Sequence, residues 1–478
     1  MSHFERHFSA IQRDIATGWD EELVPLLQEY IKIPNKSPEF DPQWEEHGYM
    51  QQAMNLIFNW VQKQPIDGMH VEIITLPKRT PLLFVEIPGQ IAETILLYGH
   101  MDKQPETSGW DIDKGPWKPT LVDNKLYGRG GADDGYSTFA SLTAIAMLQR
   151  YHIPHARCVL LIEGCEESGS FDLPFYLEQL DTKIGEPNFV ICLDSCAGNY
   201  EQMWSTTSLR GMVSGKLEIQ VTREGIHSGL GSGVVPPIEI ILRQLLDRIE
   251  DSRTGKIVLP GFEVDIPKLR IEQTQQAAKI LRNDFLRAYP FVEDTQPVSS
   301  DLNELILNRS WRSQLSITGI EGYPALINAG NVTLPKAVFK LSMRIPPTAK
   351  SGQLSEILKT TLEKNPPFKA KITFTSTERA TGWHAPPLAE WLRDANERAS
   401  QYFFNKSALY IGEGGLIPFM GMLGKKFPQA QFLITGVLGP GSNAHGPNEF
   451  LHIPYVKGIT GCVASVIASH YETFRGCK

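Results

Sequence analysis

Hydrophobic positions along the first 200 residues fall into short apolar runs separated by segments with helical spacing. Runs typical of buried strands occur at 71–76, 82–87, 94–100, 158–164 and 189–194. Residues 138–151 instead carry apolar positions at the spacing of an amphipathic helix. This alternation predicts an α/β fold with a largely parallel sheet flanked by helices. We therefore expect functional side chains at the carboxyl ends of strands, where such sheets bind ligands.

The pattern changes near residue 208. An alternating strand at 215–225 and a helix at 236–250 are followed by a long irregular stretch. A strand, a helix and a second strand then follow, at 339–345, 354–364 and 371–377. We predict an α+β insert at 208–380 that interrupts a first domain made of residues 1–207 and 381–478.

Composition and charge exclude several kinds of partner. The net charge is -8 and no long Lys/Arg block occurs, so we expect neither a nucleic-acid nor a membrane partner. The amino terminus lacks the apolar core of a secretion signal, which predicts a cytoplasmic protein. The six cysteines are too few for a disulfide framework in 478 residues, and we expect buried, reduced thiols.

Five short motifs rich in His, Asp and Glu lie at the ends of apolar strands. They are "YGHMD", "YGRGGADDGYS", "GCEESGS", "FVICLDS" and "GPGSNAHGPNEF". Each alone has an ordinary interpretation, such as a turn, a helix cap or a solvated acidic loop. Together they offer two imidazoles and three carboxylates, from His100, Asp133, Glu167, Asp194 and His445. This set suits Zn²⁺, although Mn²⁺ or Co²⁺ would accept nearly the same ligands.

Charge counting favours two metal ions. Two divalent cations are neutralised by the three carboxylates and a bridging hydroxide, which requires one carboxylate to bridge. Adjacent side chains diverge, so Glu167 can bind metal while Glu166 faces the reacting water. Asp102 lies two residues after His100 and could hold the imidazole nitrogen that does not bind metal.

The motifs "GHMD", "GRGGADD", "GCEESGS", "LDS", "HSG" and "NAHGPNE", in this order around an insert, resemble one metallopeptidase family. It includes carnosinase, cytosolic nonspecific dipeptidase, aminoacylase, carboxypeptidase G and succinyl-diaminopimelate desuccinylase. Chain length and the "EGG" loop resemble the carnosinase-like dipeptidase branch most. The resemblance implies a zinc-exopeptidase-like catalytic domain with an inserted lid and dimerisation domain, and hydrolysis of dipeptides or short peptides. An N-acyl amino acid deacylase or desuccinylase is the alternative, and a non-catalytic metal-binding protein is the third hypothesis.

The resemblance also implies roles for individual residues. The five ligands would bind two divalent ions per chain with Asp133 bridging, Asp102 would stand beside His100, and Glu166 would be the general base. A homodimer would form through the insert, and His227 would reach the partner's active site. Arg344 would bind the substrate carboxylate, a task that suits the guanidinium fork.

Departures from the family pattern occur where substrate would bind. Gly135 and Tyr136 stand where the branch usually has lysine and glycine. In the loop with Gly415, Leu416 stands where a serine often contacts substrate, and Asn331 elsewhere replaces a threonine. The metal ligands are unaffected, so these departures concern which short peptide or N-acyl amino acid is bound.

Overall fold

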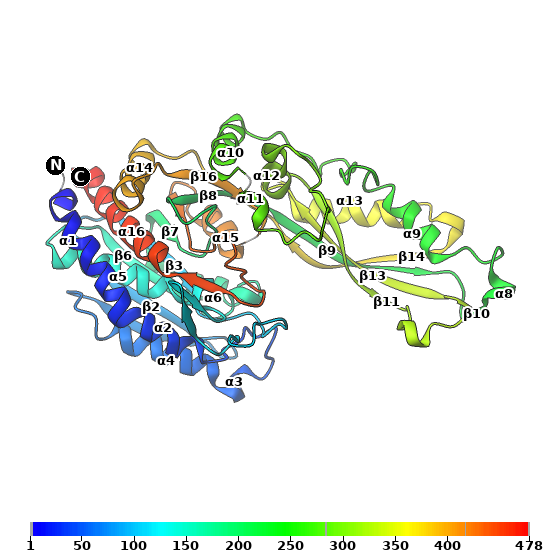
Figure 1. Ribbon diagram of the computed structural model, residues 1–478, viewed down its shortest axis with the longest axis horizontal. Coiled ribbons are helices and arrows are strands. Elements are labelled where there is room, and N and C mark those ends of the chain that lie inside the picture. Colours follow the sequence, from blue (N-terminus) through cyan, green and yellow to red (C-terminus); the bar gives the residue numbers. More distant parts are fainter. Residues whose placement is uncertain (1–2, 283, 416, 477–478) are drawn as a thin grey trace.

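A six-stranded sheet forms the centre of the first domain in the computed structural model, which describes residues 3–282, 284–415 and 417–476 (Figure 1). Its strands lie in the order β1 (His70–Ile74), β2 (Leu82–Ile87), β6 (Arg157–Glu163), β3 (Thr94–His100), β7 (Pro187–Cys192) and β17 (Gln431–Ile434). Only β2 runs against its neighbours, whereas β6, β3, β7 and β17 pair in parallel. The predicted α/β fold with a mostly parallel sheet is confirmed.

Alternate residues of each strand enter two different cores, because successive side chains of a strand point to opposite faces. In β3, Ile95 and Leu97 face the first core, while Leu96 and Tyr98 face the second. The first core is covered by α1 (His3–Gly18), α2 (Val24–Ile31), α4 (Tyr49–Val61), α5 (Ser137–Arg150) and α16 (Ile453–Phe474). The second is covered by α6 (Leu173–Gln179), α7 (Asp181–Ile184) and α15 (Pro418–Lys426). The sheet is thus sandwiched between two layers of helices.

A second, antiparallel sheet extends away from the first domain (Figure 1). It comprises β11 (Gln314–Glu321), β13 (Lys336–Ile345), β9 (Gly211–Gln220) and β14 (Lys371–Ala380), with α9 (Ile238–Leu246) and α13 (Ser351–Glu363) packed on one face. Leu341 and Met343 of β13 are buried under these helices, whereas Ser342 and Arg344 face the other side. The far end of this sheet carries β10 (Ile226–His227) and α8 (Ser228–Gly231).

The stretch between 251 and 338 is not irregular, and that prediction was wrong. It contains β11 and the helices α10 (Lys268–Leu281), α11 (Asp284–Arg287) and α12 (Leu302–Ser310). The buried side of α10 includes Gln273, Thr274 and Ala277, so the helix lacks a strongly apolar stripe in the sequence. Helices α10 and α12 pack against β16 (Leu409–Glu413), and this part of the predicted insert therefore contacts the first domain.

Two small sheets complete the first domain. The strand β8 (Trp204–Leu209) lies between β15 (Trp383–His384) and β16 and is fully buried despite its Ser and Thr residues. The strands β18 (Phe450–His452), β5 (Lys125–Tyr127) and β4 (Thr120–Val122) form the other sheet.

The remaining regular elements of the two domains are short, apart from one helix. They are α3 (Trp44–His47), α14 (Glu390–Phe404) and β12 (Val332–Thr333), the 3₁₀ turns η3 (Glu166–Ser168), η4 (Leu326–Asn328) and η5 (Pro367–Lys369), and the π-type turns η1 (Trp19–Leu23) and η2 (Gly131–Gly135).

Five cysteines are free thiols. Cys158, Cys165, Cys192 and Cys462 are buried and Cys196 is half-buried, which confirms the prediction of reduced thiols for these five, while Cys477 lies outside the described residues. Among the helices in the described part of the chain, none is long and apolar enough to cross a membrane.

Candidate active site

Three parallel strands deliver acidic and imidazole side chains to one edge of the main sheet. His100 is the last residue of β3, Asp194 follows the end of β7, and Glu166 and Glu167 follow the end of β6. The carboxyl ends of parallel strands meet at the same edge, so these side chains converge although they are far apart in the sequence. Asp133 reaches this edge from the glycine-rich turn η2.

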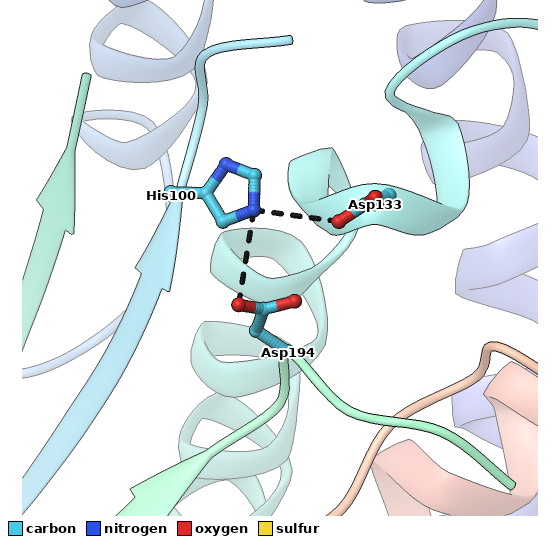
Figure 2. Close-up of side chains that lie close together, drawn as sticks. All are labelled: His100, Asp133 and Asp194. Atoms are coloured by element: carbon cyan, nitrogen blue, oxygen red, sulfur yellow. Dashed lines mark ion pairs between the residues drawn. The ribbon is translucent and has the colours of Figure 1, made fainter. Parts of the chain in front are cut away.

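The first group of side chains is His100, Asp133 and Asp194 (Figure 2). The Nε2 atom of His100 lies 3.5 Å from Asp133 Oδ1 and 3.9 Å from Asp194 Oδ2. This nitrogen is buried and has no hydrogen-bond partner among the described residues. A buried polar atom normally has a partner, and an orphan nitrogen facing two carboxylates fits a metal ligand.

The second group is Asp133, Glu167 and His445. The Nε2 atom of His445 lies 2.9 Å from Asp133 Oδ2 and 3.3 Å from Glu167 Oε2. Asp133 therefore presents one carboxylate oxygen to each group. This is the arrangement that a bridging carboxylate requires.

The electrostatics of the cluster also favour cations. Burial, reinforced by the charge of Asp133, raises the pKa of Glu167 to about 8. Burial also raises the pKa of Asp194 to about 7, although His100 opposes the shift. Buried carboxylates are costly unless they are paired or coordinate a metal, so a divalent ion at each group would stabilise them.

Asp102 anchors the turn that carries the two adjacent glutamates. Its carboxylate accepts hydrogen bonds from the backbone N–H groups of Glu166, at 3.1 Å, and Glu167, at 3.0 Å. The Nδ1 atom of His100 lies 3.1 Å from the Asp102 main-chain oxygen and 3.5 Å from its Oδ1. Asp102 thus fixes both the imidazole and the turn, a wider role than the sequence predicts.

Glu166 begins the turn η3 and is half-buried, and the charges of Asp194 and His100 in the first group act on it. Burial, followed by the charge of Asp194, raises the pKa of Glu166 well above its usual range. A carboxyl group with a raised pKa is suited to accept and release protons.

Sequence reasoning missed several residues that support the ligands. Asp134 is buried and its Oδ2 accepts a hydrogen bond from the backbone N–H of His100 at 3.2 Å. Gln104 donates from Nε2 to Oε2 of Glu167 at 2.7 Å. Asp134 lies inside the motif "YGRGGADDGYS" and Gln104 lies two residues after "YGHMD", but nothing in a polar residue's identity says which way it points.

A buried ion pair holds the loop before Asp133. The carboxylate of Glu449 accepts hydrogen bonds from Arg129 Nη1, at 2.5 Å, and from the Gly130 N–H, at 2.8 Å. Gly130 has a φ of +79°, and a Cβ there would lie 2.6 Å from the side chain of buried Lys103. Only glycine fits this position. Glu449 sits in the same motif as His445, so one motif supplies a ligand candidate and its support.

Two predicted site residues lie far from the metal-binding groups of their own chain. His227 is exposed in β10, at the far end of the insert (Figure 1). Asn331 is also exposed there, and its backbone oxygen accepts a hydrogen bond from Ser228 N–H at 2.8 Å. The structure does not bring either side chain to the cluster within one chain.

The remaining predicted substrate residues lie nearer the first domain. Arg344 is half-buried at the end of β13 where the insert begins, and Gly415 follows β16. Leu416 lies outside the described residues.

The chain is similar in sequence and fold to known peptidases. The chain is 26% identical over 464 residues to Beta-Ala-His dipeptidase of Homo sapiens, covering 92% of this chain and 88% of the relative. It is 23% identical over 433 residues to Cysteinylglycine-S-conjugate dipeptidase of Corynebacterium striatum, covering 90% of each. The crystal structure of human carnosine dipeptidase 1 superposes with a TM-score of 0.80 at 21% identity, over 98% of this chain and 99% of the other. Residues 96–469 match Peptidase family M20/M25/M40, and the chain therefore belongs to this family of metal-dependent peptidases.

Proposed function

We propose that the protein is a dipeptidase that uses two divalent metal ions per chain, with Zn²⁺ as the first candidate. The observation that carries the proposal is the pair of three-residue groups sharing Asp133. Imidazole and carboxylate ligands suit zinc, and Mn²⁺ or Co²⁺ remain chemically compatible. The dipeptidase names of the relatives support a short peptide as substrate. A cytoplasmic location stays a prediction from the sequence.

Besides the metal ligands, individual side chains transfer protons and position the groups that react. When bound, a metal pair lowers the pKa of water to about 7 and polarises the substrate carbonyl. Glu166 accepts the proton of the attacking water and returns it to the leaving amine. Asp102 is a positioning residue, because its carboxylate fixes the turn of Glu166 and Glu167.

Arg344 binds the free carboxylate of the substrate. Arg344 lies on the face of β13 that is not covered by α13. Burial lowers the pKa of Arg344, and the charge of Glu378 partly offsets this shift. A guanidinium pairs bidentately with a carboxylate, which would restrict the enzyme to peptides with a free carboxyl end close to the scissile bond.

A twofold dimer would bring His227 and Asn331 to the metals of the partner. Their exposure at the far end of the insert supports this proposal, because neither side chain reaches the cluster of its own chain. A symmetric interface would generate two equivalent composite sites. His227 would then stabilise the oxyanion that develops on the substrate carbonyl oxygen.

Three related compounds test the substrate class: Ala-Phe, Ala-Phe amide and N-acetyl-Phe, with metal-reconstituted protein. We expect Ala-Phe to be hydrolysed fastest, and the amide to lose roughly 10- to 100-fold in kcat/KM because a charged hydrogen-bonded pair is lost. The variant Arg344→Gln should hydrolyse Ala-Phe and its amide equally slowly. Lys336→Gln, on the same face of β13 but paired with Glu218, is the matched control and should behave as wild type.

Two results would reject parts of this proposal. Equal hydrolysis of Ala-Phe and its amide by the wild-type protein would remove Arg344 from carboxylate binding. Faster hydrolysis of N-acetyl-Phe than of any dipeptide would make the protein a deacylase, the alternative on the same scaffold.

A further inference from the structure

Three arginines lie together where the insert meets the first domain, and their charges are not neutralised. They are Arg210 after β8, Arg309 in α12 and Arg344 in β13. The charges of Arg309 and Arg344 both act on Arg210, and Arg344 pairs across the sheet with Met212, two residues after Arg210. Within the part of the chain that the structure describes, none of the three forms an ion pair with a carboxylate. Glu378, the carboxylate whose charge acts on Arg344, instead pairs with Lys340 at 3.7 Å.

Arg210 is the most deeply buried of the three, at 8% exposure. Its Nη1 donates to the backbone oxygens of Asn308 and Arg312, each at 3.2 Å, on either side of Arg309. The Nε atoms of Arg210 and Arg309 are buried and have no hydrogen-bond partner among the described residues. Burying a guanidinium without a counter-charge is costly, so an anion bound beside this group of charges would stabilise it.

The cluster adjoins the candidate active site. A Cβ on Gly414 would lie 2.9 Å from Arg210 Nη2 and 3.3 Å from Arg309 Cγ, so both side chains flank the loop that continues to Gly415. The preceding residue, Glu413, accepts hydrogen bonds from Ser195 Oγ at 2.9 Å and from Cys196 N–H at 3.0 Å. Those residues directly follow Asp194, so the loop that Arg210 and Arg309 flank is tied by hydrogen bonds to the segment that carries Asp194.

The three charges also act on one another. Burial, followed by the positive charges of Arg344 and Arg309, lowers the pKa of Arg210 to about 10. The hydroxyl of Tyr289 lies 3.5 Å from Arg309 Nη1, and the Phe285 ring centre lies 4.9 Å from the Arg309 guanidinium carbon. These aromatic groups hold the Arg309 side chain without neutralising it.

We propose that Arg309 and Arg344 together bind the two carboxylates of a C-terminal Asp or Glu residue, which makes the enzyme prefer dipeptides that end in an acidic residue. This inference rests on the proposed dipeptidase function and specifies its substrate. Arg344 takes the α-carboxylate and Arg309 takes the side-chain carboxylate. Arg210 is a positioning residue, since its hydrogen bonds fix the backbone on both sides of Arg309.

The test compares Ala-Glu with Ala-Gln, which have nearly the same shape and differ in the side-chain charge. We expect the wild-type enzyme to favour Ala-Glu by roughly 10- to 100-fold in kcat/KM, the effect of one charged hydrogen-bonded pair. Arg309→Gln should abolish the preference, so that the ratio of kcat/KM for Ala-Glu to that for Ala-Gln falls to about one. Arg309→Lys keeps the charge and should restore part of the preference.

Arg312→Gln is the matched control, because Arg312 follows the same helix but pairs with Glu304 and Asn308. It should leave both substrates unchanged. Equal hydrolysis of Ala-Glu and Ala-Gln by the wild-type enzyme would overturn this inference while the dipeptidase function stands. A preference for Ala-Glu that survives Arg309→Gln would also overturn it. Failure to hydrolyse any dipeptide would overturn the proposed function and this inference together.

Discussion

Glu166→Gln is expected to keep the bound metal and to lose roughly 10²- to 10⁴-fold in kcat, the usual contribution of a general base. The substitution keeps the shape of the side chain and removes the group that accepts a proton. Glu166 belongs to neither of the two candidate metal-binding groups, which predicts that metal content is unaffected. Elemental analysis and steady-state kinetics on the same preparation measure both quantities.

The neighbouring substitution should behave differently. Glu167→Gln removes a charged oxygen from the group with Asp133 and His445, so we expect loss of metal as well as activity. Glu178→Gln, on the exposed side of α6, is the control for a Glu-to-Gln change and should match wild type. If Glu166→Gln and Glu167→Gln lost metal to the same extent, the division of roles between the two residues would be wrong.

Mixing two inactive variants should restore activity if His227 acts across a dimer. A heterodimer of His227→Ala and Glu166→Gln chains has one intact site and one site that lacks both residues. Random exchange of equal amounts should therefore restore roughly a quarter of wild-type sites, as the symmetric-dimer count gives. Activity is measured after subunit exchange has been confirmed with labelled chains.

A second mixture provides the control. Glu166→Gln and Glu167→Gln both alter residues of the same chain's cluster, so their mixture should stay inactive. Absence of recovery in the His227→Ala mixture, with exchange established, would contradict a role for His227 across the dimer.

The sequence predicts the main sheet well because its elements follow strong periodicities. Residues 94–100 and 138–151 are predicted as a strand and a helix and are observed as β3 and α5. These segments are apolar enough for their burial to be evident from the sequence. The strand ends then indicate where His100 and Asp194 lie, because parallel strands share one functional edge.

Elements that bury polar or small residues could not be predicted in the same way. The strand β8 is fully buried although it reads "WSTTSL", and its Thr206 Oγ1 donates to the carboxylate of Glu413 at 2.6 Å. Helix α10 buries glutamine, threonine and alanine side chains, so its contacts with the core are not evident from the sequence. In both cases burial depends on packing against residues that are distant in the sequence, and the local hydrophobic pattern does not indicate such packing.

The same reason explains which site residues were missed. The arginine cluster is assembled from three elements that are distant in the sequence, and no motif links Arg210 to Arg309. Asp134 stands beside a predicted ligand, but only the fold shows that its carboxylate supports the His100 backbone. His445 has a φ of +64°, an uncommon conformation for a residue other than glycine, which sequence spacing could not reveal.

Counting metal ions in three proteins tests the shared carboxylate most directly. Because Asp133 presents one oxygen to each group, wild-type protein should bind about two divalent ions per chain, as co-catalytic sites do. Asp194→Ala should reduce this to about one ion, and Asp133→Ala should abolish tight binding at both groups, with folding checked by circular dichroism. About one ion in the wild-type protein, or the same loss in Asp133→Ala as in Asp194→Ala, would contradict the two-metal site.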